Sequence, residues 1–219
     1  MLEILFEDEY VLAVNKPAGL VVHPAYRNLD GTLLDALRER DSQVALSVVG
    51  RLDKLTSGIV VLAKSAATHA ALQRSWHAAE KDYLAVVCGL VDPPHGRIDL
   101  PLGTDPSDRR RRMVRADGAP SVTTFERLDY DEFSRRSLLR CRLMTGRRHQ
   151  IRVHLAASGW PVVGDAAYGE VVDGFPRHAL HAWRLTFQHP VRGAVTLSAP
   201  LPDAFTALYG EHLISRLHL

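Results

Sequence analysis

Short apolar runs are spread along the whole chain, and most of them have the length of a strand. They predict strands near residues 2–6, 10–15, 59–64, 82–89, 96–100, 112–116, 121–129, 137–144, 183–189 and 193–198. The run Ile59-Val60-Val61-Leu62-Ala63 is the clearest, because consecutive apolar residues between polar ones are typical of a buried strand. The hydrophobic pattern therefore predicts a protein rich in β-structure.

Few segments show the longer period of a helix. Residues 66–79 are rich in alanine and carry apolar residues four positions apart, which predicts a helix. A second helix is predicted over 147–158, where Gly159 ends it. A helix near 32–40 and a short one after the last strand complete the set.

This order of elements predicts an α+β fold with a largely antiparallel sheet, because strands are many, long helices are few and connections are short. The chain has no internal repeat and no low-complexity linker, and no break rich in Pro or Gly divides it. We therefore expect one domain over residues 1–219.

Composition narrows the class of protein. A chain of 219 residues, with 46% hydrophobic and 24% charged residues, is ordinary for a soluble globular protein. No apolar run approaches the roughly 18 residues of a membrane helix, and the acidic residues 1–9 do not form a signal peptide. Cys88 and Cys141 have no disulfide or metal spacing, so we expect a reducing cytoplasm.

The net charge of +2 is too small to indicate a nucleic-acid partner, but its distribution is informative. Arg109, Arg110, Arg111 and Arg112 follow turn residues, so they are expected on an exposed loop or strand start. Such clusters can neutralise phosphates. The alternative is a solvated hairpin arm.

The segment Gly50-Arg51-Leu52-Asp53-Lys54-Leu55-Thr56-Ser57-Gly58 places one carboxylate between two cations, ahead of the predicted strand at 59–64. Its Thr-Ser-Gly end is predicted to be a tight turn, and Asp53 would lie on a loop that enters a rigid strand. Taken by itself, such a cluster is usually a solvated surface group.

A second cationic segment, Thr145-Gly146-Arg147-Arg148-His149-Gln150-Ile151-Arg152-Val153-His154-Leu155, makes the solvated interpretation of Asp53 unlikely. With the Asp53 segment it resembles the RluA family of RNA pseudouridine synthases. Three shorter matches keep the family order: Asn15-Lys16-Pro17-Ala18-Gly19, Lys81-Asp82-Tyr83 and His178-Ala179-Leu180-His181-Ala182. The resemblance runs from about Ile4 to Pro200. It implies a bent, mixed sheet with flanking helices and a central active-site cleft.

The resemblance also implies a reaction, the isomerisation of uridine to pseudouridine in RNA, with Asp53 as the nucleophile. A carboxylate can play this part at a glycosidic carbon. The alternative role for Asp53 is that of a salt-bridged loop residue.

Arg152 is the expected partner of Asp53, since arginine can grip a carboxylate with two parallel hydrogen bonds. On a helix over 147–158, Arg148 and Arg152 would share a face. Tyr83 resembles the family tyrosine that stacks on the target base, and stacking is worth roughly 1–3 kcal/mol per base. The alternatives are a phosphate contact for Arg152 and core packing for Tyr83.

Further RNA contacts are expected at Arg51, Lys81, Arg147 and Arg148. Arg51 resembles a residue that helps to displace the target base, and a structural ion pair is the alternative, nearly as plausible. Many family members carry His where this chain has Gly50. This departure puts in doubt any role of that His in base flipping.

No cofactor is expected, because the isomerisation consumes neither water nor reducing equivalents. His149 and His154 do not share a helical face, and HExxH and CxxC motifs are absent, so no metal is expected. The chain has no phosphate-binding GxGxxG or GxxxxGK[ST] loop either. Asp165 and Tyr168 are expected to be structural.

The predicted partner is RNA, an rRNA or tRNA stem-loop, bound by a monomer whose chain has no N-terminal S4-type RNA-binding domain. Neither a membrane nor a nucleotide cofactor is expected to bind. A rival hypothesis is an RNA-binding or RNA-folding module of the same fold without catalysis. Glycoside hydrolysis would need a second positioned carboxylate, and none stands out in the motifs.

Overall fold

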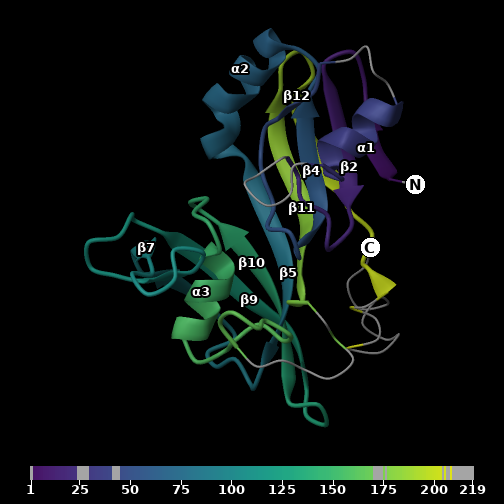
Figure 1. Ribbon diagram of the computed structural model, residues 1–219. Coiled ribbons are helices and arrows are strands. Elements are labelled where there is room, and N and C mark those ends of the chain that lie inside the picture. Colours follow the sequence, from purple (N-terminus) through teal and green to yellow (C-terminus); the bar gives the residue numbers. More distant parts are fainter. Residues whose placement is uncertain are drawn as a thin grey trace. The chain divides into compact units, whose positions relative to one another are not determined.

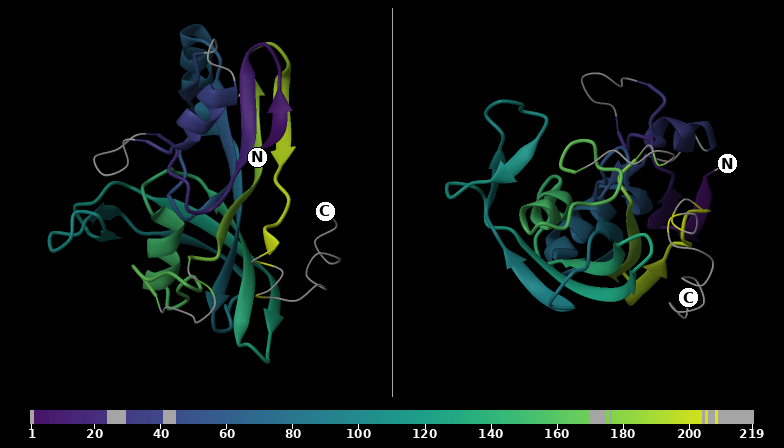
Figure 2. Two further views of the ribbon diagram at one scale, coloured as in Figure 1. Left: turned by 45° about the vertical axis from the view of Figure 1, so that its right-hand side comes forward. Right: turned by 90° about the horizontal axis from the view of Figure 1, so that it is seen from below.

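The computed structural model describes residues 2–23, 30–40, 45–169, 175, 177–203, 205 and 208. The helices in this part are α1 (Leu33–Arg40), α2 (Ala66–Ser75), the 3₁₀ helix η1 (Trp76–Ala78) and α3 (Gln150–Ala157). The strands are β1 (Glu3–Glu7), β2 (Val11–Lys16), β3 (Ser47–Val48), β4 (Ser57–Ala63), β5 (Glu80–Cys88), β6 (His95–Asp99), β7 (Leu102–Thr104), β8 (Arg112–Val114), β9 (Val122–Asp131), β10 (Arg136–Leu143), β11 (Leu180–His189) and β12 (Gly193–Ser198). Figures 1 and 2 show these elements from three directions. They confirm the α+β class.

The structure divides into two compact units. Unit 1 comprises Met1–Lys81 and Ala182–Pro200, and unit 2 comprises Asp82–His181 and Leu201–Leu219. The single domain expected from the sequence stays a prediction. Each unit is described below by itself.

In unit 1 the strands follow the order β1-β2-β4-β11, with β12 paired to β11 and β3 paired to β4. Strands β2 and β4 are antiparallel, with Val11 opposite Ala63 and Lys16 opposite Gly58. All seven residues of β4 are buried, which explains why this strand reads as a continuous apolar run in the sequence. The sheet therefore has a core on each of its faces.

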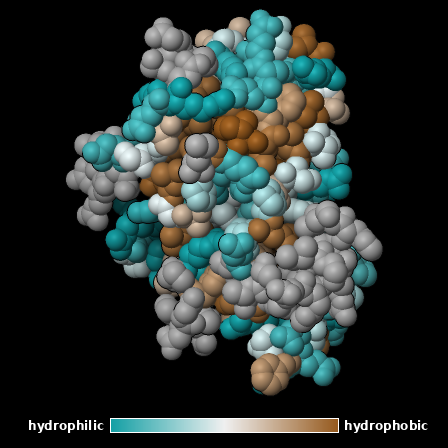
Figure 3. Space-filling model, turned by 90° about the vertical axis from the view of Figure 1, so that its right-hand side faces the viewer, coloured by the Kyte–Doolittle hydropathy of each residue, from teal (hydrophilic) through white to brown (hydrophobic). Residues whose placement is uncertain are grey.

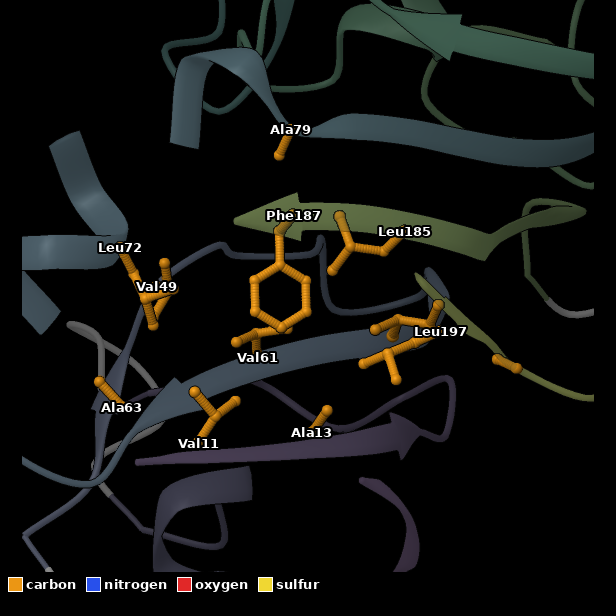
Figure 4. Close-up of a cluster of buried hydrophobic side chains, with 12 residues drawn as sticks. Val11, Ala13, Val49, Val61, Ala63, Leu72, Ala79, Leu185, Phe187 and Leu197 are labelled. Carbon is orange, nitrogen blue, oxygen red and sulfur yellow. The ribbon is translucent and has the colours of Figure 1, made fainter. Parts of the chain in front are cut away.

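Alternation along β2 and β4 divides the side chains between two hydrophobic clusters. One cluster contains Val11, Val61 and, from α2, Leu72; Figure 4 shows it with Phe187 of β11. The other contains Leu12, Leu62 and residues of α1, including Leu33 and Leu37. Helices α1 and α2 thus cover opposite faces of the unit 1 sheet. Figure 3 shows apolar side chains interspersed with hydrophilic ones on one face of the molecule.

Unit 2 contains a four-stranded antiparallel arrangement in the order β5-β10-β9-β6. A separate two-stranded sheet, the β7–β8 hairpin, projects beside α3 (Figure 1). Helix α3 is joined to β9 by two buried side chains. Gln150 donates to the Val122 carbonyl oxygen at 2.9 Å, and His154 Nδ1 lies 2.9 Å from the Thr123 hydroxyl.

Helix α3 begins at Gln150, so the predicted start at residue 147 is wrong. The reason is His149, whose φ of 58° places it in the left-handed region and interrupts the helical path. Consequently Arg148 does not lie on the helix, and the expected shared face with Arg152 does not exist. The helix ends at Ala157, and Gly159 follows with φ 86° as expected.

Each strand predicted from the apolar pattern is present, and the structure adds β3 and the three-residue β7. The predicted Thr-Ser-Gly turn is wrong, because Ser57 and Gly58 already belong to β4. A glycine is needed there for close packing, since a Cβ at Gly58 would lie 2.2 Å from the Ala182 carbonyl oxygen. The predicted C-terminal helix lies outside the continuously described residues. Among the helices described, none has the length and apolar character needed to cross a bilayer.

Candidate active site

Asp53 lies on the loop between β3 and β4, in unit 1, and its side chain is partly exposed. A turn follows it directly, since the Thr56 amide donates to the Asp53 carbonyl oxygen at 3.1 Å. The turn occupies Lys54 and Leu55 and so begins two residues earlier than the sequence predicted. As expected, a loop that leads into a buried strand carries the candidate nucleophile.

A fully buried lysine fixes this turn. Lys16 has 0% relative exposure, and its ammonium donates to the carbonyl oxygens of Pro17 and Leu20 at 2.9 Å each and of Lys54 at 3.2 Å. The Gly19 amide also donates to the Lys54 oxygen, at 2.9 Å. A buried ammonium is tolerated only when it is hydrogen-bonded. The segment Asn15–Gly19 therefore holds the backbone next to Asp53.

Gly50 packs against the indole of Trp76. A Cβ at this position would lie 2.6 Å from Trp76 Cζ2, closer than real Cβ atoms come, so the indole fills the space that a side chain here would need. Trp76 in turn packs against the hydrophobic cluster that contains Val11, Val61 and Leu72. A side chain at this position, such as the histidine of many family members, would therefore overlap the indole as it lies here.

Two residues of unit 1 that were expected to contact RNA, Arg51 and Lys81, differ in exposure and in hydrogen bonding. Arg51 is exposed. Lys81 is held by the chain itself: its ammonium donates to the carbonyl oxygens of Trp76 at 2.8 Å and Ala79 at 3.0 Å. Burial lowers the pKa of Lys81. These bonds favour a structural role for Lys81, and its contact with RNA stays a prediction.

Tyr83 belongs to unit 2, where it stands on β5 opposite Cys141 of β10 and is partly exposed. Its neighbour Asp82 is buried and bound by Arg142 through two hydrogen bonds of 2.6 and 2.7 Å. Burial, with a smaller effect of Asp82, raises the pKa of the Cys141 thiol to about 12. That thiol is therefore not available as a thiolate nucleophile near neutral pH.

Arg152 is buried on α3 and grips Asp165 with two parallel bonds of 2.7 Å, from Nε and Nη2. Burial, the largest single effect, raises the pKa of Asp165, but the hydrogen bonds and charge of Arg152, the charge of His178 and the Ala167 amide together lower it by more, so that the pKa lies below its usual value. The two-point grip predicted for Arg152 exists, although its observed partner is Asp165. Its pairing with Asp53 stays a prediction.

Tyr168 joins several members of this cluster in unit 2. Its hydroxyl accepts from the Arg112 amide at 2.7 Å and lies 2.7 Å from His149 Nδ1. The Arg152 guanidinium carbon lies 4.9 Å from the centre of its ring. Burial, above all, raises the pKa of Tyr168, so the phenol stays protonated at neutral pH.

The four arginines occupy the tip and second strand of the β7–β8 hairpin. Arg109, Arg110 and Arg111 are exposed, as the turn residues before them predicted. Arg110 forms an exposed ion pair with Asp108, at 2.9 Å, a kind of pair that phosphate can readily replace. Arg112 is bound to the Thr104 hydroxyl.

Arg147 and Arg148 precede α3 and are exposed. Arg148 reaches the hairpin, donating from Nη2 to the Arg110 carbonyl oxygen at 2.9 Å. The sequence indicates no role for Lys16, Gln150 or His154, and it predicts structural roles for Asp165 and Tyr168. Lys16, Gln150 and His154 do lie within segments shared with the family, which is the signal that could have found them. No group of three or more His, Cys, Asp or Glu within the described ranges is arranged to hold a metal ion.

Comparison with known proteins gives consistent matches. A family model described as RNA pseudouridylate synthase matches residues 10–157. The chain is 42% identical to ribosomal large subunit pseudouridine synthase D of Nitrosomonas europaea, over 94% of this chain and 64% of that protein. It is 41% identical to the uncharacterized RNA pseudouridine synthase YlyB of Bacillus subtilis, over 94% of this chain and 71% of that protein.

Among solved structures, human RNA pseudouridylate synthase domain containing 1 superposes with a TM-score of 0.81 and 27% identity. The match covers 100% of this chain and 95% of that one. This likeness confirms the expected fold. The chain spans slightly less than two thirds of the length of several curated relatives that it matches.

Proposed function

The chain belongs to the RNA pseudouridylate synthase family, and from this premise we propose that it isomerises specific uridines in structured RNA to pseudouridine. The observation that carries the proposal is the family match over residues 10–157, a range that includes Asp53, Tyr83 and Arg152. The protein acts in this proposal as a monomer in the cytoplasm.

The reaction breaks the bond between ribose C1′ and uracil N1 and forms a bond between C1′ and C5. The hydrogen on C5 is lost and a proton is gained at N1, so atoms and electrons balance without an oxidant or a hydrolytic water. This chemistry needs one nucleophilic or charge-stabilising carboxylate at the glycosidic carbon. It requires no redox group.

Asp53 supplies that carboxylate in the proposal. The residue is partly exposed, and the bonds from Lys16 and Gly19 to the next residue, Lys54, fix the loop. A fixed loop supports catalysis, because a nucleophile held in one position does not lose entropy when it meets the substrate.

Arg152 holds and orients Asp53 in the proposal, and it keeps the carboxylate charged. The bonds to Asp165 support this role, since they fix the plane of the guanidinium on α3. Tyr83 stacks on the displaced uracil, and this contact offsets part of the cost of removing the base from its own stack.

The exposed arginines of the hairpin, with Arg147 and Arg148, bind RNA phosphates in the proposal, and Arg51 and Lys81 contribute further contacts. These hairpin arginines and the two in the turn before α3 are exposed, which supports a local positive surface. Ribosomal RNA of the large subunit is the proposed substrate class, because relatives at about 40% identity are named for that activity.

Purified protein should be incubated with transcripts of large-subunit rRNA fragments and of tRNA, in buffer with EDTA, followed by nucleoside analysis. The proposal predicts pseudouridine in an rRNA transcript without an added cofactor. Pseudouridine formed only in tRNA would show that the substrate is tRNA and not large-subunit rRNA. Tight binding of both RNAs with no pseudouridine would favour the rival hypothesis of a non-catalytic RNA-binding module.

A further inference from the structure

Tyr168 contacts three separate segments of unit 2. It closes the turn that starts at Asp165, since its amide and that of Gly169 both donate to the Asp165 carbonyl oxygen, at 3.2 and 2.8 Å. Neither the sequence pattern nor the chemistry proposed above uses this tyrosine. Its side chain nevertheless lies where the arginine hairpin, the start of α3 and Arg152 come together.

The hydroxyl of Tyr168 ties the hairpin to the start of α3. The backbone amide of Arg112, the first residue of β8, donates to the hydroxyl at 2.7 Å. His149, directly before α3, lies 2.7 Å away through Nδ1. A second tie from Arg148 to the Arg110 carbonyl oxygen, at 2.9 Å, joins the same two segments.

The ring of Tyr168 contacts two guanidinium groups. Arg152 lies 4.9 Å from the ring centre and Arg111 5.4 Å from it, both within the range of a cation–π interaction. Arg152 is also bound to Asp165 on the same turn. One side chain therefore joins the exposed arginine segment that is proposed to bind RNA to the buried arginine that is proposed to hold the catalytic carboxylate.

We propose that Tyr168 is a positioning residue that couples RNA binding at the β7–β8 hairpin to the orientation of Arg152. The hydroxyl fixes the hairpin, and the ring fixes the guanidinium. Phosphate contacts that order the hairpin therefore also fix the position of the Tyr168 ring, and the ring in turn positions the Arg152 guanidinium. This inference rests on the proposed function, since it assigns the two arginine groups to substrate and catalysis.

The two parts of the side chain can be removed separately. Tyr168→Phe deletes the hydroxyl and keeps the ring, so KM for RNA should rise about 5-fold because the contacts with the Arg112 amide and His149 are lost, while kcat changes less than about twofold. Tyr168→Leu deletes both parts, so kcat should also fall, by about tenfold. A merely structural tyrosine would not separate KM from kcat in this way.

Tyr130→Phe is the matched control, because it makes the same chemical change elsewhere in unit 2, on β9, and should leave both constants as in the parent. Thermal melting checks that each variant is folded. A parent-like KM for Tyr168→Phe, or a parent-like kcat for folded Tyr168→Leu, would overturn the proposal. If Tyr168→Leu does not fold, Tyr168→Phe decides by its KM.

Failure of the proposed function has a different signature. It would appear as a parent protein that forms no pseudouridine, whereas the coupling predicts weaker RNA binding by Tyr168→Phe in a direct titration even then. An active parent with unchanged RNA affinity in Tyr168→Phe would contradict the coupling alone.

Discussion

Gly50, Lys16 and Gly19 fix the backbone around Asp53 through contacts that are remote in the sequence. The sequence singles out Asp53 only through the resemblance of its motif to the RluA family, because a carboxylate between two cations is by itself usually a solvated group. It does not identify Lys16, since lysine is rarely buried and its acceptors include the carbonyl of Lys54, which only the fold brings near. The contact of Gly50 with Trp76 is equally invisible to local reasoning.

Gly50→Ala should lower the free energy of unfolding by about 1–3 kcal/mol, because the added methyl group would overlap the Trp76 indole. Adding Trp76→Leu should recover part of that loss, since the two side chains compete for one space. Denaturant unfolding of both single variants and the double variant measures this coupling. Gly146→Ala is the control, because nothing lies near the added methyl group; additive effects of Gly50→Ala and Trp76→Leu would contradict the account.

At the scale of elements, apolar periodicity predicts where strands and helices occur but not how they pair. Strand β4 and both of its covering helices follow from the pattern of buried residues, whereas its neighbour β11 lies more than a hundred residues away in the chain. The start of α3 was placed three residues early, because a left-handed His149 leaves no signature in a periodicity. The two-residue strand β3 escapes for a similar reason, since two residues carry no period.

His154 gives α3 a predictable response to pH. Burial lowers its pKa, more than the Leu100 carbonyl and Asp99 raise it, so the fold favours the neutral imidazole. The stability it contributes is present above the unfolded pKa of about 6.5 and is lost as pH falls through that value toward the lower folded pKa. One proton limits the slope to about 1.4 kcal/mol per pH unit.

Denaturant unfolding between pH 8 and 5 should therefore show a flatter profile for His154→Gln than for the parent. The lowered pKa of Asp165 acts at more acidic pH and does not disturb this window. Parallel profiles for the two proteins would show that His154 does not titrate as described.

The β7–β8 hairpin makes its own prediction. Replacing Arg109 and Arg111 with Ala should weaken RNA binding and reduce the slope of log affinity against log salt by roughly 0.7–0.9 per lost phosphate contact. The matched control is Arg97→Ala with Arg140→Ala, which removes two exposed cations from β6 and β10. Equal slopes for the hairpin variant and the parent would show that these arginines do not contact phosphates and that the hairpin is a solvated arm.

At the scale of the whole molecule, the motifs in their order predict the family, and the match over residues 10–157 confirms it. The fold class follows from the count and length of the apolar runs. The division into two units does not follow, because no change of composition or flexible linker accompanies it. Asp53 belongs to unit 1 and Arg152 to unit 2, so their joint action is the central proposal of this account.

Asp53→Asn tests that proposal most directly, because it keeps the size of the side chain and removes its charge and nucleophilicity. Pseudouridine formation in an RNA that the parent modifies should fall below detection. Affinity for the same RNA should stay equal or improve slightly, since one repulsion with phosphate is lost. Nucleoside analysis and a binding titration measure both quantities, and pseudouridine formed by Asp53→Asn at a rate near that of the parent would contradict the account.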